Sequence, residues 1–154
     1  MLRDRLQLLN YQELIKNIIV QWLEQFYLEN QIKKKIDTMK KTNEALQAGI
    51  DLVKAGNTAN DVAQGFWKVL DKYGIEKTSR TGYSIGIGYP PDWGEHTLNI
   101  SKGDMTVLQP NVTFHMIAVM QFGNWGVEAS EAIRVTDKGS ELFYNFSKEL
   151  HIKS

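Results

Sequence analysis

Apolar residues follow a helical period through the first half of the chain and a strand period through the second. Between residues 31 and 55 they are separated by three, four or seven positions, which keeps them on one side of a helix. The stripe consists of Ile32, Ile36, Met39, Leu46, Ile50 and Val53. This pattern predicts an amphipathic helix of about seven turns.

A second helix is predicted to follow the first directly. Gly56 tolerates the left-handed conformation that ends many helices, and Thr58 with Asp61 forms a variant of the capping box that starts them. Gly74 ends the second helix in the same way as Gly56 ends the first. Its apolar stripe is Val62, Phe66, Val69 and Tyr73. We expect the two helices to form a hairpin over a shared core.

After Ile75, glycines, prolines and β-forming residues replace the helical period. Residues 112–122 predict one long strand, residues 122–126 a hairpin loop, and residues 131–135 the returning strand. Residues 137–139 predict a turn into a short closing helix. Helices followed by antiparallel strands predict the α+β class, with the helical hairpin packed on a curved sheet.

Residues 1–30 stand apart from these two patterns. Their apolar residues suit one more helix, at Leu6, Leu9, Leu14, Ile18 and Leu23. Acidic residues flank the apolar cluster and no small-residue cleavage site follows it, so it does not have the pattern of a signal peptide. We therefore expect residues 1–30 to be a helical packing segment and residues 31–154 to be the main unit.

Composition narrows the classes of protein that fit. The 154 residues allow one compact domain, and 18 basic against 18 acidic side chains leave no net field to attract nucleic acid or an anionic membrane. The absence of cysteine excludes disulfides, thiolate metal sites and a thiol nucleophile. No apolar run is long enough to span a membrane. We expect a cytoplasmic protein with no nucleic-acid or membrane partner.

The stretch GYSIGIGYPPDWGEHT at residues 82–97 combines glycines with aromatic, acidic and imidazole side chains. Such a mixture suits the wall of a binding site more than a core element. Trp93 beside Glu95 is a plausible cradle for a small cation, and a surface loop anchored by a buried Trp explains the pair equally well. Both interpretations stay open at the level of sequence.

Histidine and carboxylate positions in the predicted strands offer further candidates. Strand alternation places His115 and Ile117 on one face and Met116 on the other, and one of these faces could line a cavity. Glu128 and Glu131 are three residues apart and point to opposite faces. Glu131 falls on the core side together with its apolar neighbours, where a carboxylate must be paired, protonated or functional. The three histidines show no HExxH or HxH spacing.

Four strings in the sequence resemble the C-terminal half of the creatinase, prolidase and methionine aminopeptidase family, which has the pita-bread fold. They are KAGNTANDVAQGFWKVLDKYGI, GYSIGIG, VLQPNVTFHMI and GVEASEAIRVTDKG, and together they span about residues 31–150. The Trp-containing loop and the Gly-Val-Glu variant are most similar to the ectoine hydrolase branch. Members of that branch open the cyclic amidine of ectoine to acetyl-diaminobutyrate.

The resemblance also exposes departures from the family's metal site. Metallopeptidases of the family hold two metal ions with two Asp, one His and two Glu residues. Here Tyr83 stands at the His position, Ile117 at the first Glu position, and Ser130 at the second, with Glu131 one place along. These side chains cannot hold a divalent pair with a bridging carboxylate. We therefore expect no metal and no other cofactor, as in the metal-independent branches.

The two Asp ligands of the family lie on a hairpin before residues 31–55, and only about 30 unmatched residues precede that helix here. The sequence therefore predicts a truncated relative with half of the pita-bread domain. We expect homodimerisation or another association to cover the face that the missing half would occupy.

The resemblance implies a metal-independent C–N hydrolase acting on a small zwitterion. It assigns catalytic roles to His115 and Glu131, and substrate contacts to Tyr83, Trp93, Glu95 and Glu128. Two alternatives stay open: an Xaa-Pro peptidase-like metallohydrolase, and an inactive remnant that serves as a binding or subunit-interaction module.

Overall fold

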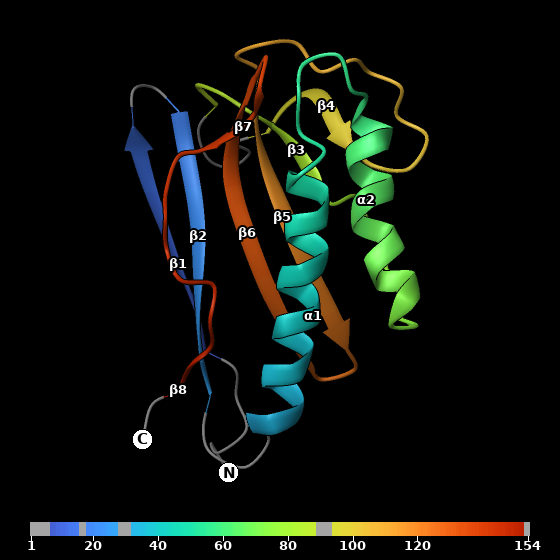
Figure 1. The fold of residues 1–154 in the computed structure, drawn as a ribbon. Helices are drawn as coiled ribbons and strands as arrows, with labels where there is room; N and C mark the ends of the chain where they lie inside the picture. The colour runs from blue at the N-terminus through green and yellow to red at the C-terminus, as the bar shows by residue number, and fades with distance from the viewer. Residues whose placement is uncertain (1–6, 16–17, 28–31, 89–93, 153–154) are drawn as a thin grey trace.

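Within residues 7–15, 18–27, 32–88 and 94–152, which it describes, the computed structural model has two helices packed on a curved five-stranded antiparallel sheet (Figure 1). The sheet order is β4-β3-β5-β6-β7, and a smaller sheet has the order β1-β2-β8. The helices are α1 (Ile32–Ile50) and α2 (Ala59–Lys72). The strands are β1 (Gln7–Ile15), β2 (Ile18–Tyr27), β3 (Gly82–Ile85), β4 (Gly94–Ile100), β5 (Thr113–Phe122), β6 (Trp125–Thr136), β7 (Gly139–Leu142) and β8 (His151–Ile152).

Helix α1 has the predicted apolar stripe but ends at Ile50 instead of near residue 55. The chain beyond it bonds to other segments: the Ala55 N–H donates to the Thr136 carbonyl at 3.1 Å, and the Gly56 N–H to the Leu108 carbonyl at 3.0 Å. The Asp51, Leu52 and Val53 N–H groups still donate to carbonyls three or four residues back, and from Ala55 onward the long-range hydrogen bonds replace helical ones. The apolar spacing predicted a longer helix because Val53, which lies beyond the end of α1, is also buried in the core.

Helix α2 begins as the capping box predicts. The Asp61 N–H donates to Thr58 Oγ1 at 3.1 Å, and the Thr58 N–H donates to Asp61 Oδ2 at 2.8 Å. Gly74 follows the helix with φ +63°, which is the left-handed conformation expected there. Helices α1 and α2 pack side by side as the predicted hairpin.

The helices cover one face of the β5–β6 pair. Even-numbered residues of β5 and odd-numbered residues of β6 share a buried core with residues of both helices. On the strands these are Phe114, Met116, Ala118, Met120, Val127, Ala129, Ile133 and Val135. We call this side of the two strands the helix face. The predicted alternation in β5, with Phe114 and Met116 on the core side, is confirmed.

The predicted N-terminal helix is wrong. Residues 7–15 and 18–27 form the antiparallel strands β1 and β2, with Ile15 paired to Ile18. The second run, IIVQWLEQFY, is rich in β-branched and aromatic residues, which favour strands. Its leucines and isoleucines also fit a helical spacing, so the periodicity of this short apolar segment was ambiguous.

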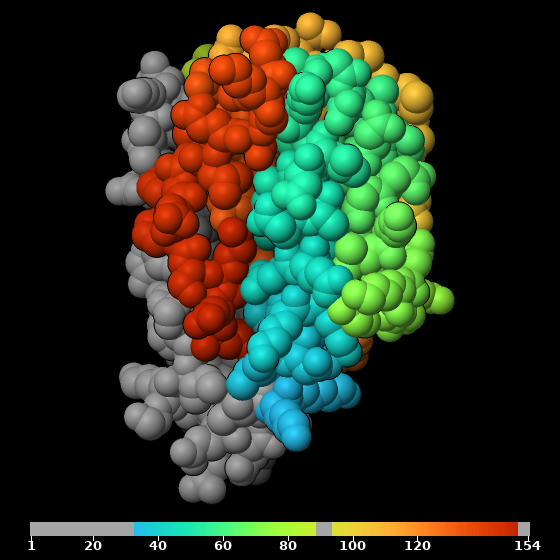
Figure 2. Space-filling view, in the orientation of Figure 1, coloured from blue at the N-terminus to red at the C-terminus, as the bar shows by residue number. Residues whose placement is uncertain are grey.

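The predicted closing helix is also wrong. A turn at residues 137–139 is present, with Gly139 at φ +149°, but it leads into β7. The chain continues along the free edge of β6, where the Phe143 N–H donates to the Ala132 carbonyl at 3.1 Å. It then runs beside α1, as Figure 2 shows for the red segment against the blue-green helix. Pairing with an open sheet edge thus outweighed any local helical preference.

Candidate functional site

The side of the β5–β6 pair that is turned away from the helices carries three of the six candidate side chains. His115 pairs with Ala132, and Ile117 pairs with Ser130, so these four residues lie on one face. Tyr83 of β3 pairs with His115 and joins them. We call this side the site face. It comprises Tyr83, His115, Ile117, Glu128, Ser130 and Ala132.

Tyr83 and His115 form the centre of the site face. The Tyr83 hydroxyl lies 3.0 Å from His115 Nδ1, and the two rings meet edge to face. His115 is only 1% exposed, and this burial lowers its pKa from 6.5 to about 4. The imidazole is therefore neutral at physiological pH, with one ring nitrogen protonated.

His115 Nε2 and Ser130 Oγ on the site face are buried and have no hydrogen-bond partner among the residues that the structure describes. Ser130 is the diagonal neighbour of His115, because the residue directly opposite His115 is Ala132. Buried polar atoms are nearly always paired, so an unpaired couple on one face indicates a place for a ligand or water. Ser130 was missed as a site residue, although counting alternate positions back from Ala132 would have reached it.

Glu128 lies farther along the same face, opposite Val119. Burial raises the pKa of its carboxyl from 4.5 to about 7, and the charge of Lys77 partly offsets this rise. At Lys77, desolvation lowers the pKa of the ammonium group, and the charge of Glu128 partly offsets this lowering. Glu128 can thus gain or lose a proton close to neutral pH, which suits a general acid or base.

Glu131 does not share a site with Tyr83 and His115. It lies on the helix face, is 6% exposed, and forms an ion pair with Lys148 at 2.6 Å. The position on the core side was expected, but the expected cooperation with His115 is wrong. The reason is the strand register: Glu131 pairs with Met116, whose side chain also points toward the helices. Its carboxylate is held by a partner and fastens the segment after β7 to the sheet.

The Glu95 side chain forms a hydrogen bond with the backbone of the glycine-rich stretch. Its Oε1 accepts a hydrogen bond from the Gly88 N–H at 2.8 Å, and its side chain lies against Gly86. Glu95 therefore bridges the start of β4 to the chain that follows β3. Trp93, the other half of the expected cation cradle, lies outside the described residues.

Gly82 explains part of the glycine content of this stretch. A Cβ atom there would lie 2.8 Å from Ile100 Cγ1 and 3.0 Å from the His115 carbonyl oxygen. Strand β3 could then no longer fit between β4 and β5. Because Gly82 has no side chain, β3 can lie close to both neighbouring strands, and Tyr83 is thereby paired with His115.

The described residues do not fit the pair of metal ions implied by the family resemblance. Three of the family's ligand positions are occupied here by Tyr83, Ile117 and Ser130. The Ser130 hydroxyl is a poor ligand for a divalent cation, and the Ile117 side chain has no atom that can bind one. No three His, Asp or Glu side chains in the described part of the chain gather as a metal site. Strands β1 and β2 precede α1, where the family's Asp-bearing hairpin lies, and contain no Asp.

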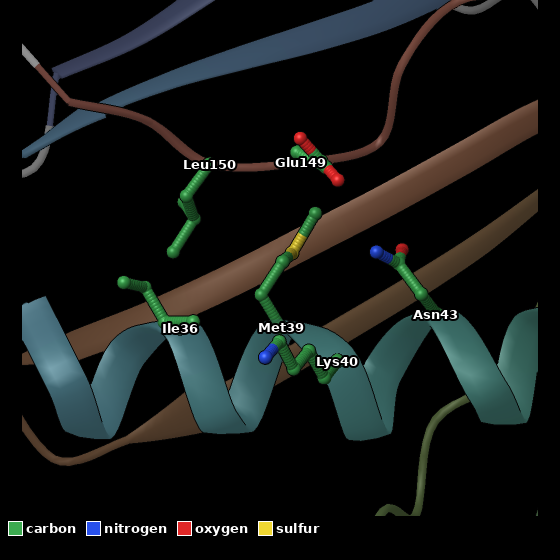
Figure 3. A pocket seen from close by; sticks show the side chains of 6 residues that line it. All are labelled: Ile36, Met39, Lys40, Asn43, Glu149 and Leu150. Atoms are coloured by element: carbon green, nitrogen blue, oxygen red, sulfur yellow. The ribbon is translucent and has the colours of Figure 1, made fainter.

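A hollow of about 430 Å³ lies between α1 and the chain after β7, away from the site face (Figure 3). Its floor is apolar, and a charged side chain borders it on each side. The lining residues are Ile36, Met39, Lys40, Asn43, Glu149 and Leu150. None of the candidate site residues contributes to this hollow.

Comparison with known proteins gives the family. Residues 24–137 match the model of metallopeptidase family M24. The chain belongs to this family. It is 39% identical to an ectoine hydrolase of Halomonas elongata over 111 residues, which is 71% of the chain and 28% of that protein. It is 42% identical over 110 residues to an uncharacterized hydrolase/peptidase of Sinorhizobium fredii, covering 68% of the chain and 26% of the relative.

Solved structures of the family share the fold. A dipeptidase from Mycobacterium ulcerans superposes with a TM-score of 0.83 at 20% identity, over 94% of this chain and 39% of the other. A methionine aminopeptidase from Rickettsia prowazekii gives 0.71 at 15% identity, over 92% and 64%. These likenesses confirm the pita-bread fold. The chain spans about a quarter of the length of the curated M24 relatives that it matches.

The described helices of this M24 chain include none that is both long and apolar enough to cross a membrane.

Proposed function

We propose that this M24 chain contributes to a hydrolase that opens a C–N bond in a small zwitterion without a metal ion, with ectoine as the substrate. The observation that carries the proposal is the site face itself. At the positions where the family's metallopeptidases bind metal, it presents the phenol of Tyr83, the aliphatic side chain of Ile117 and the hydroxyl of Ser130. Beside them lie the buried neutral imidazole of His115 and the Glu128 carboxyl with its raised pKa. The 39% identity to an ectoine hydrolase supports the choice of substrate.

In the proposed reaction, water adds to the amidine carbon of the ring and one C–N bond breaks. The carbon keeps the oxygen, and the departing nitrogen takes up a proton, which gives acetyl-diaminobutyrate. Glu128 can hold or move that proton, because its pKa of about 7 allows both forms near neutrality. Tyr83 and His115 bind and orient the ring. Phe143 and Tyr144 pack against the Ala132 end of the face and exclude water there.

The test is incubation of the purified chain with ectoine, with and without a chelator, while acetyl-diaminobutyrate is measured by chromatography. The ectoine hydrolase of Halomonas elongata serves as the positive control. We expect binding of ectoine and product formation that the chelator leaves unchanged. The Glu128→Gln variant should lose turnover and keep binding, because the amide cannot exchange a proton.

Two other outcomes would each replace the proposal. Hydrolysis of an Xaa-Pro dipeptide that depends on added Mn²⁺, Co²⁺ or Zn²⁺ would establish the metallopeptidase alternative. Binding of ectoine without turnover in either condition would establish the binding-module alternative.

A further inference from the structure

His115 and Ser130 of the site face keep buried polar atoms without a hydrogen-bond partner among the described residues, whereas the buried carboxylate of Glu131 on the helix face is paired. Glu131 has Lys148 at 2.6 Å, but His115 Nε2 and Ser130 Oγ have no partner. Leaving a buried polar atom unpaired lowers stability, so such atoms on one face represent a cost to the fold. A ligand group that bonds to both atoms would offset it.

The hydrogen bond to Tyr83 determines what His115 offers to such a ligand. The hydrogen bond joins the Tyr83 hydroxyl and His115 Nδ1, and its direction depends on the tautomer of the imidazole. Because a phenol is a better donor than acceptor and a neutral imidazole nitrogen is a strong acceptor, we assign the Tyr83 O–H as the donor to Nδ1. The single ring proton of the neutral imidazole must then reside on Nε2. His115 thus presents an N–H donor on the site face, next to the Ser130 hydroxyl.

We propose that His115 Nε2–H and the Ser130 O–H form a donor pair that binds one oxygen atom of a ligand carboxylate, with Tyr83 as the residue that positions the imidazole. Diagonal neighbours on paired strands lie about 7–8 Å apart at their Cα atoms, which leaves room for one oxygen between the two donors. This assignment rests on the proposed function and identifies how the carboxylate of the zwitterion is held.

Glu128 supports the same orientation of the ligand. It precedes Ser130 by two positions on β6, so its Cα lies about 7 Å farther along the same face. A carboxyl at one end and two neutral donors at the other suit a compact zwitterion: the cationic ring faces Glu128 and the carboxylate faces His115. A ligand with only the cationic ring would leave the donor pair unused.

The first experiment measures the His115 tautomer by NMR of the ¹⁵N-labelled chain and does not depend on turnover. We expect the Nε2–H form in the wild type, and a shift toward the Nδ1–H form in Tyr83→Phe, which removes the donor to Nδ1. A His115 ring protonated on Nδ1 in the wild type would overturn the donor pair. A purely structural contact between the rings would leave the tautomer unchanged in Tyr83→Phe.

The second experiment compares the affinities for ectoine and for the same ring without its carboxylate, by calorimetry. We expect Ser130→Ala to weaken ectoine binding by about 10-fold, as the loss of one hydrogen bond to a charged group implies, and to leave the decarboxylated ring unaffected. The exposed Ser140 provides the matched control, since Ser140→Ala should change neither affinity. Equal weakening for both ligands would contradict the assignment.

Stability measurements separate a binding role of Ser130 from a structural one. Removal of an unpaired buried hydroxyl relieves a desolvation cost, so Ser130→Ala should be at least as stable as the wild type in urea. Acetate distinguishes the two proposals if ectoine does not bind. A shift of the His115 Nε2–H signal on adding acetate would preserve the donor pair and reject ectoine as substrate, whereas an unmoved signal would reject both.

Discussion

The two faces of the β5–β6 pair are built from alternate residues of the same strands, yet they differ in how polar groups are treated. On the helix face, aliphatic and aromatic side chains fill the space, and the buried carboxylate of Glu131 is paired with Lys148. On the site face, His115 and Ser130 keep polar atoms without a partner. The contrast indicates that the helix face maintains the fold and that the site face retains capacity to bind.

The largest expected effect is on stability, and it tests whether the two faces are packed differently. Phe114 on the helix face is fully buried, so Phe114→Ala should lower the free energy of unfolding by about 3–5 kcal/mol. Ile117 on the site face is only partly buried, and Ile117→Ala should cost about half as much. Urea denaturation followed by circular dichroism measures both. Equal losses would show that the two faces are packed alike.

The next effect concerns the paired carboxylate of the helix face. Lys148→Met leaves Glu131 buried without its partner and should lower the free energy of unfolding by about 3 kcal/mol at pH 8. The loss should shrink at pH 5, because burial already raises the pKa of Glu131 and removal of the lysine raises it further. A pH-independent loss would mean that the lysine stem, and not its charge, holds the segment after β7. Lys138→Met, at an exposed turn, is the control.

A smaller expected effect is the pH dependence of stability that Glu128 of the site face contributes. Glu128 titrates near 7 in the folded chain and near 4.5 when unfolded, so its stabilising contribution is complete below pH 4.5 and is lost as the pH rises through 7. Glu128→Gln should therefore reduce the loss of stability between pH 5 and pH 8 by about 2 kcal/mol. His115 acts in the opposite direction, because its lowered pKa removes stability as the pH falls from 6.5 toward 4.

Urea titrations of wild type and Glu128→Gln at several pH values isolate the Glu128 contribution from that of His115. A pH profile that the substitution leaves unchanged would place Glu128 in contact with water.

Much of the fold was predictable because its signals are local. The capping box at Thr58 and Asp61 involves residues three apart. Gly74, which follows α2, adopts a left-handed conformation that depends only on the local backbone. The N-terminal strands were not predictable in this way. Their apolar residues fit two periods, and pairing between two separate segments decided for strands.

The candidate site was predictable in its members more than in their arrangement. His115 and Tyr83 could be singled out from residue type and family resemblance, and they do meet. Glu131 was assigned to the same site because it is a carboxylate near the expected position, but the register turned it to the helix face. Ser130 was noted only as a missing ligand, since an unpaired hydroxyl is visible only when its surroundings are known.

The helical hairpin followed by antiparallel strands, the alternation along β5 and β6, and the loss of metal-ligating side chains could be predicted from the sequence alone. They depend on residue types and on backbone geometry within a few positions. The pairing of His115 with Ala132, the burial that keeps its imidazole neutral and the partner of Glu131 emerged only in the folded molecule. Each depends on contacts between segments far apart in sequence, and those are set by the packing of the whole core.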